Sequence, residues 1–154
     1  MTKHSTSVIK VYIDTNVLVN YITGQKADID ALDYIFKKRR KEVLFTSSLA
    51  LVQAITQLQK GNKKNGRKGY DSARAGKEIS ELKKRMTVLD LTEADIDKGI
   101  IIAEKDLEDS IHLAVCLKVG CQAVVTNNVS DFSSFADIKT LDAGNIGVIK
   151  QRIS

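Results

Sequence analysis

Three aspartates lie where the sequence predicts that a strand gives way to a helix or a turn, and together they could hold a metal ion. Asp14 ends an apolar run, Asp109 opens a helical run, and Asp131 follows a second apolar run and a polar turn. In a parallel α/β sheet, residues just past the carboxyl ends of the strands meet in one crevice. Carboxylates brought together there repel one another, and a hard divalent cation is the usual compensation. The pattern therefore predicts a metal-dependent enzyme.

Each of these aspartates also has an explanation that involves no metal. Aspartate is among the best N-cap residues, and Asp14 and Asp109 both lie at predicted helix starts, while Asp131 could cap a turn. However, Asp14 directly follows a fully apolar strand, where a carboxylate is costly unless it is paired or bound to metal. Further polar residues accompany all three aspartates, and single caps do not explain such clusters at several strand ends.

Apolar runs and helical patterns alternate along the chain, which predicts a parallel sheet covered by helices on both faces. The predicted strands are 8–13, 43–45, 88–91, 122–126 and 138–141, and the predicted helices are 15–21, 28–41, 49–60, 71–84, 96–104, 110–117 and a C-terminal tail. The glycine-rich and lysine-rich run 61–69 has the composition of a loop. We expect an α/β fold, a three-layer α/β/α sandwich with a central, mainly parallel sheet, in a single domain over residues 1–154.

Composition limits the classes of function. The 43% hydrophobic and 28% charged content is that of an ordinary globular chain, and no apolar run approaches the ~18–20 residues of a membrane span. The polar start predicts no signal peptide, and two cysteines without zinc-site spacing indicate a reduced, cytoplasmic protein. A net charge of +5 permits a polyanionic partner. Four tyrosines, four phenylalanines and no tryptophan argue against recognition by base stacking on an aromatic sheet.

Three motifs lie in a recognisable order along the chain. They are Val-Tyr-Ile-Asp-Thr-Asn-Val-Leu at 11–18, Lys-Asp-Leu-Glu-Asp-Ser at 105–110 and Thr-Asn-Asn-Val-Ser-Asp-Phe at 126–132. Together they resemble the motifs of the PIN-domain ribonucleases, the family of the VapC-type toxins of toxin–antitoxin modules, over a span from Val8 to about Leu141. The resemblance implies a PIN-like fold and a nuclease that cuts RNA with Mg²⁺ or Mn²⁺. It also implies a separately encoded antitoxin partner, and a homodimer would be in character for the family.

The resemblance implies roles for the matching residues. Asp14, Asp109 and Asp131 are the expected catalytic residues: Asp14 and Asp109 as principal metal ligands, and Asp131 as a ligand through water or the ligand of a second ion. Glu108 is a further expected ligand. The surrounding side chains expected to orient waters or ligands are Thr15, Asn16, Gln53, Asp106, Thr126 and Asn128.

Two positions depart from the family's pattern. Many members carry a glutamate early in the helix after the second strand, where this chain has Gln53, and the usual arginine after the fourth strand is Asn127. An amide can hold a water but supplies no charge. Glu108 and Asp106 could supply the missing charge; otherwise the site has only three carboxylates, and its metal affinity or activity is weak.

His112 and the basic segment allow two interpretations each. His112 is expected to pair with Glu108 one turn earlier, and a proton relay is the alternative. The cations Lys60, Lys63, Lys64, Arg67 and Lys68 could contact RNA phosphates without reading sequence, or could belong to a solvated mobile loop.

Three functions therefore compete. The first is an endoribonuclease toxin held in check by an antitoxin. The second is an RNA-processing nuclease with no toxin role. The third is a catalytically weakened PIN domain that serves as an RNA- or protein-binding scaffold, with Gln53 as the first sign of decay.

Overall fold

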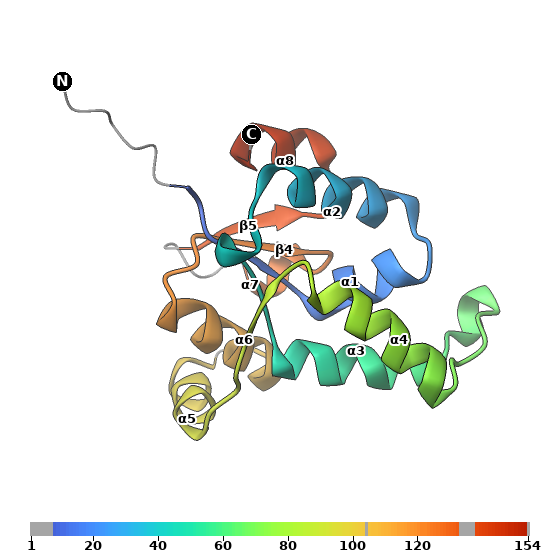
Figure 1. Cartoon of the computed structure of the whole chain (residues 1–154). Helices are drawn as coiled ribbons and strands as arrows, with labels where there is room; N and C mark the ends of the chain where they lie inside the picture. The colour runs from blue at the N-terminus through green and yellow to red at the C-terminus, as the bar shows by residue number, and fades with distance from the viewer. Residues whose placement is uncertain (1–7, 104, 133–137, 154) are drawn as a thin grey trace.

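A five-stranded parallel sheet forms the centre of the protein in this computed structural model, which describes residues 8–103, 105–132 and 138–153 (Figure 1). The strand order is β3-β2-β1-β4-β5, with β1 Val11–Ile13, β2 Leu44–Ser47, β3 Thr87–Leu89, β4 Ala123–Thr126 and β5 Lys139–Asp142. Every pairing between neighbouring strands is parallel. The middle strand β1 is completely buried, which explains its continuous apolar sequence.

Helices follow the strands along the chain. They are α1 Thr15–Ile22, α2 Lys26–Lys38, α3 Ser48–Lys60, α4 Ser72–Lys83, α5 Glu93–Ile102, α6 Leu107–Lys118, α7 Val129–Phe132 and α8 Ile146–Ile153, with 3₁₀ turns at Lys41–Val43 and Lys63–Asn65. Helix α8 packs beside α2, and α5 packs beside α6 (Figure 1). No helix in the described part of the chain combines the length and the apolar character that a membrane crossing requires.

Two separate apolar clusters cover the two faces of the sheet. Alternate residues of β1 point to opposite faces, so Val11 and Ile13 pack with the larger cluster, which includes residues of α1 to α4 and α8. Tyr12 packs with the smaller cluster, which includes Leu113 of α6 and Phe132 of α7. The predicted α/β sandwich with a parallel central sheet is confirmed.

Several predicted boundaries are wrong by a few residues. β1 begins at Val11 rather than at residue 8, and α2 ends at Lys38 rather than at residue 41 because Arg39 is extended (φ −128°, ψ 134°). Its guanidinium Nε donates to the carbonyl of Ile9, 3.3 Å away. Glu104, the predicted end of α5, and the polar start of the chain at 1–7 lie outside the described residues.

The predicted inward face of α3 is also partly wrong. The spacing of Leu51, Val52, Ile55 and Leu58 predicts that these four side chains face inward, but the side chain of Val52 is 62% exposed. Ala50, Leu51, Ala54 and Leu58 form the buried stripe of this helix instead. Ala50 and Ala54 are fully buried, and the helix orientation that buries them turns Val52 outward.

Candidate active site

A polar cleft of about 520 Å³ contains the predicted aspartates. Asp14 follows β1, Asp109 lies in the first turn of α6, and Asp131 lies in α7. The structure thus brings together three residues that are far apart in sequence. The other predicted site residues that line the cleft are Thr15, Asn16, Gln53, Asp106, Glu108 and Asn128, joined by His112. Thr126 is buried behind Asp14.

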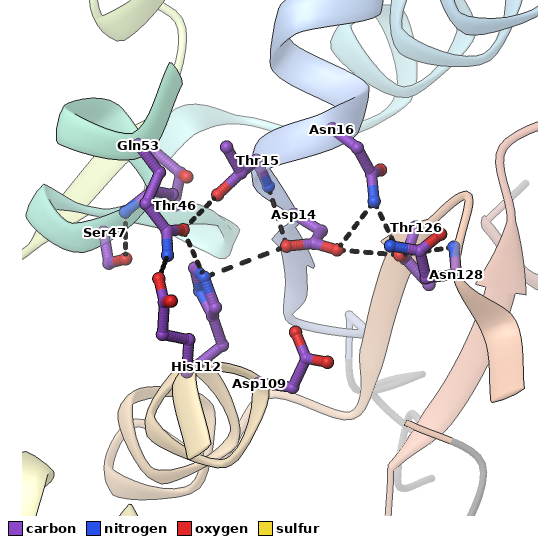
Figure 2. Close-up of polar contacts among 12 residues, drawn as sticks. Asp14, Thr15, Asn16, Thr46, Ser47, Gln53, Asp109, His112, Thr126 and Asn128 are labelled. Atoms are coloured by element: carbon purple, nitrogen blue, oxygen red, sulfur yellow. Dashed lines mark hydrogen bonds and ion pairs between the residues drawn. The ribbon is translucent and has the colours of Figure 1, made fainter. Parts of the chain in front are cut away.

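The carboxylate of Asp14 is buried and held by neutral donors (Figure 2). Its Oδ1 accepts from the backbone N–H of Thr15 at 2.8 Å, as expected of an N-cap. Its Oδ2 accepts from Thr126 Oγ1 at 2.8 Å and from Asn16 Nδ2 at 3.2 Å. Asp14 is therefore both a cap and a cleft residue. Its position is fixed by hydrogen bonds to uncharged groups, which leave its negative charge uncompensated.

Asp109 does not open its helix as the sequence suggested. Asp106 is the N-cap of α6, and its Oδ1 accepts from the backbone N–H of Asp109 at 3.0 Å. The side chain of Asp109, which is not used as a cap, points from α6 toward Asp14 (Figure 2). Burial, followed by the nearby charges of Asp106, Asp131, Asp14 and Glu108, raises the pKa of Asp109 from 3.8 to about 7. Burial and the repulsion among the cleft acids together let Asp109 hold a proton near neutral pH.

These residues fit a hard divalent cation. The cleft is lined by carboxylate, amide and hydroxyl oxygens, and no lysine or arginine of the described chain lines it. No three acidic, histidine or cysteine side chains among the described residues already stand as a ligand cluster. Direct protein ligands would therefore be few. Mg²⁺ suits such a site because it keeps several waters and is held by one or two carboxylates.

Gln53 links two sides of the cleft. Its Oε1 accepts from Thr15 Oγ1 at 2.7 Å, and its Nε2 donates to the carboxylate of Glu108. Gln53 Oε1 also lies 2.8 Å from His112 Nε2, so this ring nitrogen carries the proton and donates it. The Gln53 amide thus organises the cleft without adding charge.

The predicted pairing of His112 with Glu108 is wrong. His112 is buried, its Nε2 is bonded to Gln53, and its Nδ1 accepts from the hydroxyl of Tyr12 at 2.6 Å. Burial lowers the pKa of His112 despite the opposing charges of Asp14, Glu108 and Asp106. The imidazole is therefore neutral at neutral pH. It acts as a buried connector, and Glu108 bonds to Gln53 instead.

Sequence reasoning missed the buried partners behind His112. The hydroxyl of Tyr12, whose proton goes to His112, accepts from Ser47 Oγ at 2.6 Å, and Ser47 Oγ in turn accepts from the backbone N–H of Ala50 at the start of α3. Tyr12 lies within an apolar strand, where its sequence context predicts only a core residue. The one sequence signal for a polar group at this end of the sheet was that Tyr12 comes two residues before Asp14.

Asn127 has a structural partner that sequence reasoning also missed. Its Nδ2 donates to Asp28 Oδ2 at 2.8 Å, and its backbone N–H donates to Asn16 Oδ1 at 3.1 Å. Asp28 is 4% exposed and also accepts from Asn20 Nδ2 at 3.3 Å. A chain of amides thus connects a buried acid of α2 to Asn16 and, through it, to Asp14. Asp28 lies in the first turn of a helix, where acids are common, so nothing in the sequence marked it.

The basic segment lies next to the acidic cleft, beyond the C-terminal end of α3. Lys60, Lys63, Lys64 and Arg67 line a second hollow of about 640 Å³. Lys68 is exposed outside that lining. Four of the five predicted cations therefore share one surface.

A parallel sheet with an acidic cleft beyond β1 and β4 defines the protein as one of the PIN-domain class. The PIN-domain family profile matches residues 11–138, most of the chain. The chain belongs to the PIN-domain family.

Among its relatives, ribonuclease VapC1 of Aquifex aeolicus (strain VF5) is 26% identical over 145 residues, which cover 86% of this chain and 91% of that protein. DNA-bound VapBC of Salmonella typhimurium has a TM-score of 0.65 at 18% identity, and the match covers 88% of this chain and 99% of that chain. VapC20 of Mycobacterium tuberculosis, described as a sarcin–ricin loop cleaving toxin, has a TM-score of 0.61 at 18% identity, with 84% and 97% covered. The two structural likenesses show a shared fold.

Proposed function

We propose that this protein is a divalent-metal-dependent endoribonuclease and the toxin of a toxin–antitoxin pair in the cytoplasm. The observation that carries the proposal is a cleft lined by Asp14, Asp109 and Asp131 and by no lysine or arginine of the described chain. The raised pKa of Asp109 supports it, because its causes are burial and the neighbouring acids, and a bound divalent cation would offset both. Membership of the PIN-domain family and the relationship to a ribonuclease support the choice of RNA as substrate.

The cleft residues divide into metal-holding and positioning groups. Asp14 and Asp109 would hold Mg²⁺ or Mn²⁺, with Asp131 and Glu108 contributing directly or through water. Thr126 and Asn16 fix Asp14 by donating to its Oδ2. A bound ion would supply Lewis acidity toward a phosphoryl oxygen and lower the pKa of a nearby water.

The remaining polar side chains of the cleft hold the acids in position. Gln53 bonds both Thr15, next to Asp14, and Glu108, in the first turn of α6. It thereby fixes the distance between the strand side and the helix side of the cleft. Asn128 lines the cleft together with Asp131, and the backbone N–H of Asn128 donates to Thr126 Oγ1 at 3.0 Å. Such supporting contacts hold ligands in a productive arrangement.

A cognate antitoxin is the proposed protein partner. Two of the similar structures are VapBC proteins bound to DNA, from Salmonella typhimurium and, with a TM-score of 0.62 at 14% identity, from Rickettsia felis. The cleft suits inhibition by a basic side chain, because an ammonium or guanidinium group would compensate the same acids that a metal ion would. The partner would then compete with the metal ion and with RNA for one surface.

The test is cleavage of total host RNA by the wild type and by Asp14→Asn, each with Mn²⁺ and with EDTA. We expect cleavage only by the wild type with metal. Equal cleavage by the variant would indicate a contaminating nuclease. If both folded proteins fail to cleave, the scaffold function replaces the enzyme, provided that Asp14→Asn still binds RNA as the wild type does.

The toxin role has a separate test. Induced expression of the wild type should arrest growth of a bacterial host, and Asp14→Asn should not. If the purified enzyme cuts RNA but its expression leaves growth unchanged, the protein is an RNA-processing nuclease without a toxin role.

A further inference from the structure

A second hollow lies beside the acidic cleft and has the opposite charge. We call it the basic hollow, and it is formed by α1, the end of α3 and the loop that follows. Its lining includes Gln57, Lys60, Asn62, Lys63, Lys64 and Arg67. No acidic side chain of the described chain lines it. Three lysines and an arginine thus face a hollow whose other polar groups are amides and a hydroxyl.

The loop that carries these cations is held by hydrogen bonds of its own. Asn62 and Arg67 exchange two backbone hydrogen bonds, of 2.8 and 2.9 Å. The side chain of Asn62 accepts from the N–H of Lys64, and that of Asn65 accepts from the N–H of Arg67, both at 3.0 Å. Gly66 has a φ of +73°, which closes the turn with little strain only for glycine.

Gly61 makes the turn out of α3 possible. Its φ is +78°, and a Cβ atom there would lie 2.6 Å from the carbonyl oxygen of Arg67 and 2.6 Å from the backbone nitrogen of Gly69. Only a residue without a side chain allows the two ends of the loop to lie so close together. The lysines are therefore held on a defined backbone.

Arg67 differs from the lysines because its guanidinium is already used. It donates to the carbonyl oxygens of Leu58, at 3.4 Å, and Gln57, at 3.5 Å, at the end of α3. Its Cζ also lies 5.8 Å from the ring centroid of Tyr70. Arg67 thus fastens the loop to the helix, where its charge also suits the negative end of the dipole.

Lys60, Lys63 and Lys64 remain available for a ligand. None of them takes part in an ion pair among the described residues, whose pairs involve Lys26, Lys84, Lys118 and His112. All three lysines are exposed. Three ammonium groups on a hydrogen-bonded loop and a helix end, with no acid of the described chain lining their hollow, raise the local potential for an anion.

The basic hollow continues into the acidic cleft along one face of α3. Gln57 lines both. Gln53, Gln57 and Lys60 are spaced at i, i+4 and i+7, so they lie on the same side of the helix. The seven-residue separation between Gln53 and Lys60 corresponds to about 10 Å along the axis. A strand with its reacting phosphate in the cleft therefore reaches the lysines within a few nucleotides.

We propose that the basic hollow binds backbone phosphates of the RNA strand as the strand leaves the acidic cleft. The assignment rests on the proposed nuclease function and adds the path of the substrate. The acids of the cleft repel phosphates, and the three lysines offset that repulsion beside it. Because lysines contact phosphates rather than base edges, the hollow contributes affinity and orientation but no sequence preference.

The test is a binding titration in the Asp14→Asn background, which prevents cleavage. The probe is a short fluorescent oligouridylate, followed by anisotropy over a range of salt concentrations in Mg²⁺. One variant carries Lys60→Gln, Lys63→Gln and Lys64→Gln. The matched control carries Lys37→Gln, Arg40→Gln and Lys41→Gln, which removes the same charge from the exposed basic segment at the end of α2.

We expect the hollow variant to bind roughly tenfold more weakly at about 50 mM salt, and the slope of log K against log salt to fall by about one to two. The control should keep nearly all of the wild-type slope. Equal losses in both variants would mean that only net charge matters and would overturn the site. So would unchanged RNA binding in a hollow variant that loses affinity for polyglutamate, since the surface would then belong to an acidic protein partner.

This experiment is independent of the nuclease assay. If the hollow variant loses RNA binding and the wild type does not cleave RNA, the nuclease function is contradicted and the RNA-binding role of the basic hollow is supported. If the wild type cleaves RNA and the hollow and control variants bind it equally, the role of the basic hollow is contradicted and the nuclease function is supported. Thermal unfolding of each variant confirms that the loop substitutions leave the protein folded.

Discussion

Gln53 donates a hydrogen bond from its Nε2 to the carboxylate of Glu108, across the cleft between α3 and α6. The Gln53 amide adds no charge of its own on α3, and it holds the carboxylate of Glu108 on α6. The same amide oxygen accepts from His112, so the neutral side chain also keeps the imidazole in one tautomer.

Placing an acid at this position should therefore destabilise the metal-free protein. Gln53→Glu places a carboxylate against Glu108 and removes the donor between them. We expect a lower melting temperature at pH 8 in EDTA, by about 2–4 °C for each kcal/mol lost, and partial recovery with Mg²⁺. Gln57→Glu is the matched control, because it adds the same charge to the same helix without a bond to Glu108. An equal loss in both variants would contradict the specific role of Gln53.

The raised pKa of Asp109 predicts how the stability of the metal-free protein depends on pH. The folded protein keeps a proton on Asp109 up to about pH 7, whereas the unfolded chain releases it near 3.8. Between these values the folded state binds more protons, so this group's contribution to stability falls as pH rises. Because Asp109 is partly exposed, solvent screening reduces the size of the effect.

Asp109→Asn should remove the fall in stability that Asp109 causes as pH rises. We expect urea unfolding in EDTA to show a gain in stability for the variant at pH 8 and little change at pH 5. Asp97→Asn, which removes an exposed acid from α5, is the control and should show no such pH-dependent gain. A gain that is equal at both pH values would show that repulsion among the cleft acids is not its cause.

Metal binding should couple to the same proton. A divalent cation binding only the folded state raises the melting temperature by RT ln(1 + [L]/Kd). Because the ion competes with the proton on Asp109, the increment from Mn²⁺ should grow as pH rises through about 7. Asp14→Asn and Asp109→Asn should each reduce it. Differential scanning fluorimetry at pH 6 and 8 measures both effects, and a wild type that shows no shift in millimolar Mn²⁺ at either pH would count against the site.

The principal residues of the site could be predicted from the sequence because they follow strand ends, which the local sequence pattern marks. Asp14 follows an apolar run, and the carboxyl ends of parallel strands must lie at one edge of the sheet. The helix start at α6 was misplaced because Asp106 and Asp109 are both acceptable caps, and only the backbone geometry selects Asp106. The sequence does not show which of two nearby acids is used as a cap.

The long-range contacts of the site were not predictable in the same way. Gln53 meets Glu108, and His112 meets Tyr12, across 55 and 100 residues of sequence. An i,i+4 rule assigns partners within one helix, and it assigned Glu108 to His112 because it cannot include a side chain from α3. Burial decided the outcome: a histidine facing the interior needs buried partners for both nitrogens.

The buried acid Asp28 supplies the last prediction. Its Oδ2 accepts from Asn127 Nδ2 at 2.8 Å, and Asn127 also bonds Asn16, which bonds Asp14. Asn127→Ala removes the shorter of the two side-chain bonds to a carboxylate that is 4% exposed. We expect a loss of about 1–3 kcal/mol in the free energy of unfolding, the cost of an under-satisfied buried polar group.

The same substitution should lower nuclease activity, because Asn16 loses its contact with the side chain of Asn127 and Asp14 becomes less well held. Asn128→Ala serves as the control for stability, since Asn128 bonds Thr126 through its backbone N–H, which alanine retains. Urea unfolding and the RNA cleavage assay on both variants measure the two effects. If Asn127→Ala is as stable as Asn128→Ala, water replaces the lost amide at Asp28, and the chain of amides does not support the site.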